Sequence, residues 1–196
     1  MIQQFLTEVD WTGDTDGLDY LIVDTPPGTS DEHISTVQYL QKAGAVSGAV
    51  LVTTPEEISM ADVRKELNFC QKTKVPIMGV VENMGQYTTT LQKLKFHDAE
   101  GKDSTVEIIE KLKTACPEIF DTVISAEIFP ISGGGPKAMA EQYQVPYWGV
   151  LPMDPNLLEC CEKGSTFVDE YPDSVSAKAL KNFCEQITSQ LKVDEV

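Results

Sequence analysis

A hydrophobic run that ends in aspartate and leads directly into a proline-proline-glycine turn is the most constraining feature of this chain. Residues 19–28 read Asp-Tyr-Leu-Ile-Val-Asp-Thr-Pro-Pro-Gly. The apolar, β-branched residues favour a buried strand, and we expect one over residues 21–24. A carboxylate at the end of such a strand, beside a rigid turn, suits the Mg²⁺ and terminal-phosphate side of a nucleotide site. The run therefore predicts an α/β protein that handles phosphates.

The other half of such a site is missing from the sequence. A phosphate-binding P-loop, G-x-x-x-x-G-K-[ST], normally opens a domain of this kind. No window of the 196 residues matches it. We expect a chain that carries one half of a nucleotide site.

Length and charge exclude several classes of protein. A chain of 196 residues with 41% hydrophobic content is sufficient for one domain with a substantial core. Its 15 basic and 31 acidic residues give a net charge of −16, which repels nucleic acid and anionic membranes. No stretch approaches the roughly 20 apolar residues that span a bilayer, and the first residues do not resemble a signal peptide. We predict a cytoplasmic protein with neither nucleic acid nor a membrane as its partner.

The cysteine pattern argues against a disulfide scaffold and against a closed zinc site. The five cysteines are odd in number, and no C-x-x-C spacing occurs among them. We interpret each of them as a buried thiol: Cys70, Cys116, Cys160, Cys161 and Cys184.

Short apolar runs alternate with helical patterns along the chain, which is typical of βαβ units around a parallel sheet. We expect further strands at residues 48–54, 76–83, 124–129 and 147–151. Helix starts are indicated by capping residues or a first-turn proline at Ser30, Ser59, Ser104, Pro136 and Ser174. Residues 86–115 interrupt the pattern, and we predict an insertion there.

Four motifs, in this order, resemble the Mrp/Nbp family of MinD-like P-loop ATPases. They are Val-Asp-Thr-Pro-Pro-Gly-Thr-Ser-Asp at residues 23–31, Val-Val-Glu-Asn-Met at 80–84, Gly-Gly-Gly at 133–135 and Leu-Pro-Met-Asp-Pro at 151–155. The chain is most similar to the eukaryotic cytosolic branch that scaffolds iron–sulfur cluster assembly. The resemblance implies a parallel-sheet P-loop NTPase fold. Since Met1 aligns inside the family's domain, it also implies that residues 1–196 form one partial domain, incomplete at its N-terminus.

The resemblance implies roles for the first motif. Asp24 matches the carboxylate that holds Mg²⁺ through water and positions the attacking water, which makes it the catalytic candidate. Pro26 and Pro27 fix the turn, and Gly28 lets its N–H approach the γ-phosphate of ATP. We interpret Asp31 and His33 as ordinary residues of the first turn of the following helix.

The second and fourth motifs are expected to hold the base of ATP. Asn83 follows a strand, and its amide can both donate and accept at the edge of adenine. By resemblance, Pro152 and Asp154 flank the same base. Turn formation is the alternative role for these two residues.

The metal motif departs from the family pattern. Relatives carry C-P-x-C, and two subunits together hold a bridging [4Fe–4S] cluster with four thiolates. Here the matching segment is Cys116-Pro117-Glu118-Ile119, so only Cys116 is left to bind iron.

Two hypotheses follow. In the first, the chain is the C-terminal part of an ATPase that scaffolds iron–sulfur clusters, with Mg-ATP at a dimer interface. Such a protein would form a homodimer, or a heterodimer with a related P-loop ATPase, and would serve apo iron–sulfur client proteins. In the second, it is a nucleotide-free interaction protein that has lost the P-loop and one cluster ligand.

Overall fold

The computed structural model describes residues 2–13, 16–26, 28, 30–44, 46–131 and 133–191, without the side chains of Thr7 and Asp121. Its α-helices are α1 (Ile2–Glu8), α2 (Asp31–Lys42), α3 (Glu57–Thr73), α4 (Thr105–Ala115), α5 (Gly135–Tyr143), α6 (Pro155–Lys163), α7 (Phe167–Glu170) and α8 (Val175–Gln190). Two 3-10 helices, η1 (Leu91–Lys93) and η2 (Pro117–Asp121), accompany the strands β1 (Ala49–Thr53), β2 (Ile77–Thr90), β3 (Val123–Glu127) and β4 (Tyr147–Met153).

The sheet is built around β2. Strands β1 and β4 both pair with β2 in parallel, whereas β3 pairs antiparallel with the second half of β2. Helix α3 connects β1 to β2, and α5 leads into β4, as parallel connections require. The predicted α/β class with a parallel sheet is confirmed, and the antiparallel β3 makes the sheet mixed.

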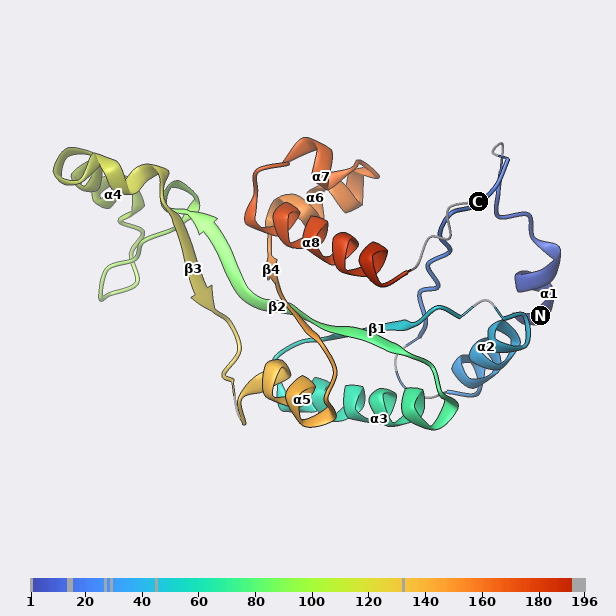
Figure 1. The fold of residues 1–196 in the computed structure, drawn as a ribbon. Coiled ribbons are helices and arrows are strands. Elements are labelled where there is room, and N and C mark those ends of the chain that lie inside the picture. The colour runs from blue at the N-terminus through green and yellow to red at the C-terminus, as the bar shows by residue number, and fades with distance from the viewer. Residues whose placement is uncertain are drawn as a thin grey trace.

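Helices cover both faces of the sheet. Figure 1 shows α3 and α5 along one face, and α6, α7 and α8 over the other. The first face packs on one buried cluster, formed by Leu51, Met60, Leu67, Val80, Met139 and Ala140. The second packs on Met78, Val81, Trp148 and Phe183. A Cβ on Gly79 of β2 would lie 2.2 Å from the ring of Trp148 on β4, so only glycine fits at this position.

Most predicted helix starts are confirmed. The hydroxyl of Ser30 accepts from the His33 backbone N–H, and that of Ser174 accepts from Ala177. Pro136 lies in the first turn of α5. The expectation for Ser59 is wrong, because α3 already begins at Glu57.

The predicted strand at residues 21–24 is not formed. This segment is irregular, and Ile22 is 85% exposed. A strand is stable only where its backbone pairs with a neighbour. Residues 21–24 pair with no described strand, so their apolar composition alone does not fix an extended ladder.

Strand β2 is longer than predicted. We expected it to end at Asn83, but it continues to Thr90 beyond a residue with positive φ, Met84. Its second half and β3 form an arm (residues 86–127) that also contains η1, α4 and η2, and Figure 1 shows this arm projecting away from the helical layers. The region predicted as an insertion, residues 86–115, lies within the arm. Within it, α4 begins after Ser104 as predicted, but the Ser104 side chain makes no capping hydrogen bond, and the Thr105 N–H donates to Asp103.

The cysteines differ in environment. Cys70 and Cys160 are buried, as expected, and burial raises the pKa of the Cys70 thiol to about 11. Cys161 and Cys184 are exposed, so the prediction of buried thiols is wrong for these two. Among the described residues, no helix is long and apolar enough to cross a bilayer.

Candidate functional site

The parallel strands end along one border of the sheet, which we call the carboxyl edge. Thr53, the last residue of β1, pairs with Glu82 of β2, and Asn83 pairs with Leu151 of β4. Ligands of α/β proteins bind outside the carboxyl ends of the strands. The carboxyl edge is therefore the candidate site.

Three of the predicted site residues lie along this edge. Asn83 is half-buried on β2, and it pairs with Leu151 of β4, the residue before Pro152. Pro152 is buried within β4, and Asp154 follows the strand directly. The Asp154 carboxylate accepts from the Asn156 backbone N–H at 2.9 Å and caps α6. The structure thus places Pro152 one residue beyond the β4 partner of Asn83, and it gives Asp154, just after the end of β4, a capping contact.

Glu82, the residue before Asn83, carries a buried carboxylate that was not among the predicted site residues. Glu82 is 6% exposed, and the Tyr147 hydroxyl donates to its Oε2 at 2.7 Å. Burial, and then this hydrogen bond, raise the pKa of Tyr147 above its ordinary value. A Cβ on Gly85 would lie 2.3 Å from Glu82 Oε1. The sequence signal was an acidic residue within an apolar strand, which is rarely buried without a partner.

The phosphate-side residues lie elsewhere. Asp24 and Pro26 are exposed in the irregular segment, and Pro27 lies outside the described residues. Gly28 has φ of +83°, which suits glycine, and its carbonyl accepts from His33 Nδ1 at 2.9 Å. The same His33 nitrogen is 3.4 Å from Glu66 of α3.

The contact with Glu66 places Gly28 away from the carboxyl edge. Glu66 lies nine residues beyond Glu57, where α3 begins close to the end of β1. Nine residues correspond to about 14 Å along a helix. In this structure Gly28 is therefore beside the middle of α3 and is not assembled with Asn83.

Cys116 lies on the arm. It is half-buried at the junction of α4 and η2, and its carbonyl accepts from the Ile119 N–H at 3.1 Å. Figure 1 shows this junction far from α5 and α3. Among the described residues, no group of three or more His, Cys, Asp or Glu side chains is arranged to hold a metal ion.

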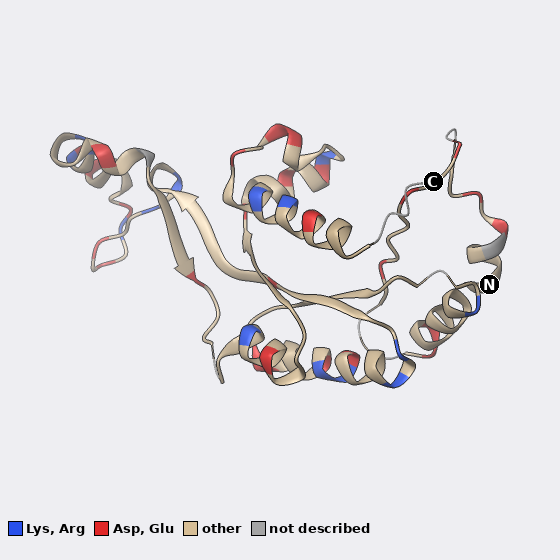
Figure 2. Cartoon of the chain, in the orientation of Figure 1, with Lys and Arg blue, Asp and Glu red and all other residues tan. Residues whose placement is uncertain are grey.

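The charges are mixed over the helices. Figure 2 shows Lys and Arg interspersed with Asp and Glu on α3, α5 and α8. On α3, for example, Arg64 pairs with Glu57 and Lys65 with Asp62. The basic residues of these helices are thus set among acidic ones, and they form no basic face there that would attract a nucleic acid.

Comparison with known proteins identifies the family. A ParA family model described as "NUBPL iron-transfer P-loop NTPase" matches residues 1–116 and 100–188. The chain is 41% identical over 191 residues to the "Cytosolic Fe-S cluster assembly factor NUBP1 homolog" of Caenorhabditis briggsae. That match covers 97% of this chain and 50% of the relative, so the chain spans half the length of that protein.

Solved structures share the fold. The cell division ATPase MinD of Pyrococcus furiosus matches with a TM-score of 0.53 and 21% identity, over 90% of this chain and 54% of MinD. The nucleotide-binding protein of Archaeoglobus fulgidus, solved in complex with ADP, matches with a TM-score of 0.53 and 27% identity, over 85% of this chain and 52% of that chain. The resemblance seen in the four motifs is confirmed, and the chain belongs to the ParA (NUBPL iron-transfer P-loop NTPase) family.

Proposed function

We propose that this chain is the C-terminal part of an ATP-binding scaffold that assembles iron–sulfur clusters and passes them to apo client proteins. The observation that carries the proposal is the 41% identity, over 97% of the chain, to a relative named as a cytosolic Fe-S cluster assembly factor. The similar archaeal protein was solved with ADP, which supports an adenine nucleotide as the ligand.

The base of ATP is proposed to bind at the carboxyl edge. The Asn83 amide offers a donor and an acceptor to the adenine edge, while Pro152 and Asp154 flank the ring. The pairing of Asn83 with Leu151, the neighbour of Pro152, supports this arrangement, because it sets Asn83 and Pro152 on adjoining strands, and Asp154 follows the second of them.

The phosphates are proposed to bind Asp24, Pro26 and Gly28. Mg²⁺ keeps several waters and takes one or two carboxylates beside the phosphates. The exposed carboxylate of Asp24 fits that requirement, and the bound ion would neutralise phosphate charge. Asp24 would hold the water shell of the ion, and Gly28 would present its N–H to the γ-phosphate. Since Gly28 lies beside α3 here, nucleotide binding requires this segment to move toward the carboxyl edge.

The residues of this chain do not fit a complete [4Fe–4S] site. Such a cluster takes four thiolates, and two copies of the chain would supply only two through Cys116. The described residues around Cys116 add no group of further ligands.

The assembly of the protein and its location in the cell are part of the same proposal. We propose a homodimer, or a heterodimer with a related P-loop ATPase, that holds Mg-ATP at its interface in the cytoplasm. The name of the relative as a cytosolic assembly factor supports the location and the iron–sulfur clients.

A nucleotide-free interaction protein is the second candidate. The observation that favours it is the placement of Asp24 in an exposed, irregular segment. An upstream segment with a P-loop would favour the ATPase. A native protein that begins at Met1 would favour the interaction protein, and the intact mass of the protein from its source distinguishes them.

Asn83→Ala tests the site for the base. In the chain joined to an upstream segment with a P-loop, we expect this change to weaken Mg-ATP about 5- to 150-fold, since a lost bidentate pair to a base costs roughly 1–3 kcal/mol. Binding of tripolyphosphate should stay unchanged, because Asn83 does not touch the phosphates. Calorimetric titration measures both ligands. The matched control is Asn68→Ala, at an exposed position on α3. Equal losses for both ligands would show that Asn83 acts structurally.

Ile119→Cys tests the metal motif. After anaerobic reconstitution, the unmodified chain should hold well below one [4Fe–4S] per dimer, because Cys116 alone leaves half the coordination empty. The Cys116 carbonyl closes a turn with the Ile119 N–H, and side chains three apart in such a turn lie on one side. Ile119→Cys should therefore raise iron content, whereas the neighbouring Glu118→Cys should not. A stoichiometric cluster that persists in Cys116→Ser would contradict the assignment.

A further inference from the structure

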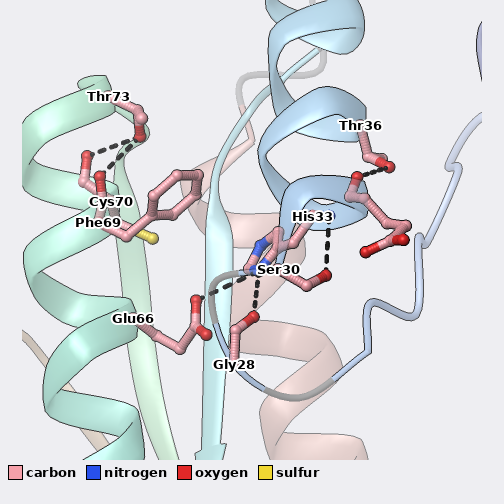
Figure 3. A network of polar contacts seen from close by, with 9 residues as sticks. Gly28, Ser30, His33, Thr36, Glu66, Phe69, Cys70 and Thr73 are labelled. Atoms are coloured by element: carbon pink, nitrogen blue, oxygen red, sulfur yellow. Dashed lines mark hydrogen bonds and ion pairs between the residues drawn. The ribbon is translucent and has the colours of Figure 1, made fainter.

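The first turn of α2 contacts α3 through a buried histidine. His33 is 8% exposed and is the buried residue of α2, all of whose residues are described. Its Nδ1 donates to the Gly28 carbonyl at 2.9 Å and lies 3.4 Å from Glu66 Oε2. Its ring packs against Phe69, with centroids 5.0 Å apart. Figure 3 shows His33 between Gly28 and Glu66, so that one N–H faces two acceptors, one before α2 and one on α3.

The Glu66 carboxylate, the second of these acceptors, lacks part of its hydrogen bonding. Glu66 Oε1 is buried and has no hydrogen-bond partner among the described residues. Burial and the nearby charge of Asp62 raise the pKa of Glu66, while His33 opposes the rise. A buried polar atom without a partner costs free energy until a donor reaches it. Glu66 therefore has one carboxylate oxygen, Oε2, at 3.4 Å from His33 Nδ1, and a second, Oε1, with no donor among the described residues.

Helix α2 is fixed to α3 at its other end as well. Gln41 Nε2 donates to the Thr73 carbonyl at 2.7 Å, eight residues beyond His33. At the first turn, the Ile34 N–H donates to the Ser30 carbonyl at 3.0 Å, which joins the end of the Gly28 turn to the helix. Because the far end of α2 is fixed, a displacement of Gly28 acts mainly on the contacts of His33.

We propose that His33 is a positioning residue that transmits the state of the Gly28 turn to α3, by exchanging its single Nδ1–H between the Gly28 carbonyl and the Glu66 carboxylate. The inference rests on the proposed function, because the ligand that moves the turn is the terminal phosphate of ATP. When Gly28 moves toward the phosphate, its carbonyl leaves His33 and the N–H turns to Glu66. The proton stays on Nδ1 and only its acceptor changes. A hydrogen bond to a carboxylate is stronger than one to a carbonyl, which favours the exchange.

Two substitutions separate the N–H from the packing of the ring. His33→Asn keeps an amide donor near the position of Nδ1, and His33→Phe keeps a ring against Phe69 but removes the donor. In the chain joined to a P-loop segment, His33→Phe should weaken Mg-ATP and Mg-tripolyphosphate alike, by about tenfold, the scale of one hydrogen bond. In His33→Asn, both affinities should lie within about threefold of those of the same joined chain with His33. Equal affinity in all three proteins would overturn the inference.

Nitrogen-15 NMR of the imidazole rings tests the exchange directly. The chain has two histidines, and His97 is exposed on the arm. His97→Asn therefore assigns the His33 signals and is the matched control. We expect Mg-ATP to shift the His33 Nδ1 resonance and to leave His97 unchanged. Tight Mg-ATP binding with an unmoved His33 signal contradicts the inference alone. A native protein that binds no Mg-ATP contradicts the proposed function and this inference with it.

Discussion

A polypeptide of these 196 residues is expected to hydrolyse Mg-ATP at least about 10³-fold more slowly than the same chain joined to a P-loop segment. The sequence contains no G-x-x-x-x-G-K-[ST] window, and thus neither the lysine that pairs with the phosphates nor the hydroxyl that binds Mg²⁺. Removing one such stabilising group from an active site typically costs about 10²–10³-fold in rate, and several are absent here.

Phosphate release from Mg-ATP measures the effect, with Asp24→Asn as the control for contaminating activity. Any residual rate in the 196-residue polypeptide should be the same with and without this substitution. Turnover comparable to that of the joined protein, and abolished by Asp24→Asn, would refute the prediction. It would also mean that the chain assembles a phosphate site from residues that the four motifs do not identify.

Elements with strong local signals were predicted well from the sequence. Ser30 and Ser174 each accept a backbone N–H three residues on, so the signal and the contact lie within a single turn. Pro136 likewise marks the first turn of α5. Such contacts do not depend on the rest of the fold, which is why the sequence contains enough information to place them.

The expected strand at residues 21–24 shows what local signals miss. Its apolar composition is that of a buried strand, yet β structure is formed by pairing, and the described sheet offers these residues no neighbour. The opposite error occurred at β2, which continues past Asn83 because β3 pairs with its second half. In both cases the outcome depends on a partner that a linear pattern does not reveal.

The candidate site divides in the same way. Parallel topology alone predicts that the carboxyl ends of adjoining strands lie at one edge, and Asn83 of β2 does pair with Leu151 near the end of β4. The contacts of Glu82 with Tyr147 and of His33 with Glu66 join residues 65 and 33 positions apart. His33 was interpreted as an ordinary helix residue because its acceptor on α3 lies too far along the sequence for a local pattern to reveal it.

Leu67→Ala tests whether the sheet and α3 form one cooperative layer. Leu67 is 0% exposed and packs with Leu51 of β1, Val80 of β2 and Met139 of α5. Replacing a buried leucine by alanine removes its transfer free energy and leaves a cavity, so we expect the free energy of unfolding to fall by roughly 2–5 kcal/mol. At about 2–4 °C per kcal/mol for a chain of this size, Tm should fall by roughly 4–20 °C.

Ile58→Ala on the same helix is the matched control. Ile58 is 83% exposed, so its truncation leaves no cavity and should change the free energy of unfolding by no more than about 0.5 kcal/mol. Urea titration followed by circular dichroism measures both variants. If Leu67→Ala cost no more than Ile58→Ala, α3 would not pack on the sheet in solution. Glu66, the residue before Leu67, would then lose the position in which it meets His33, because the same packing holds both side chains of α3 in place.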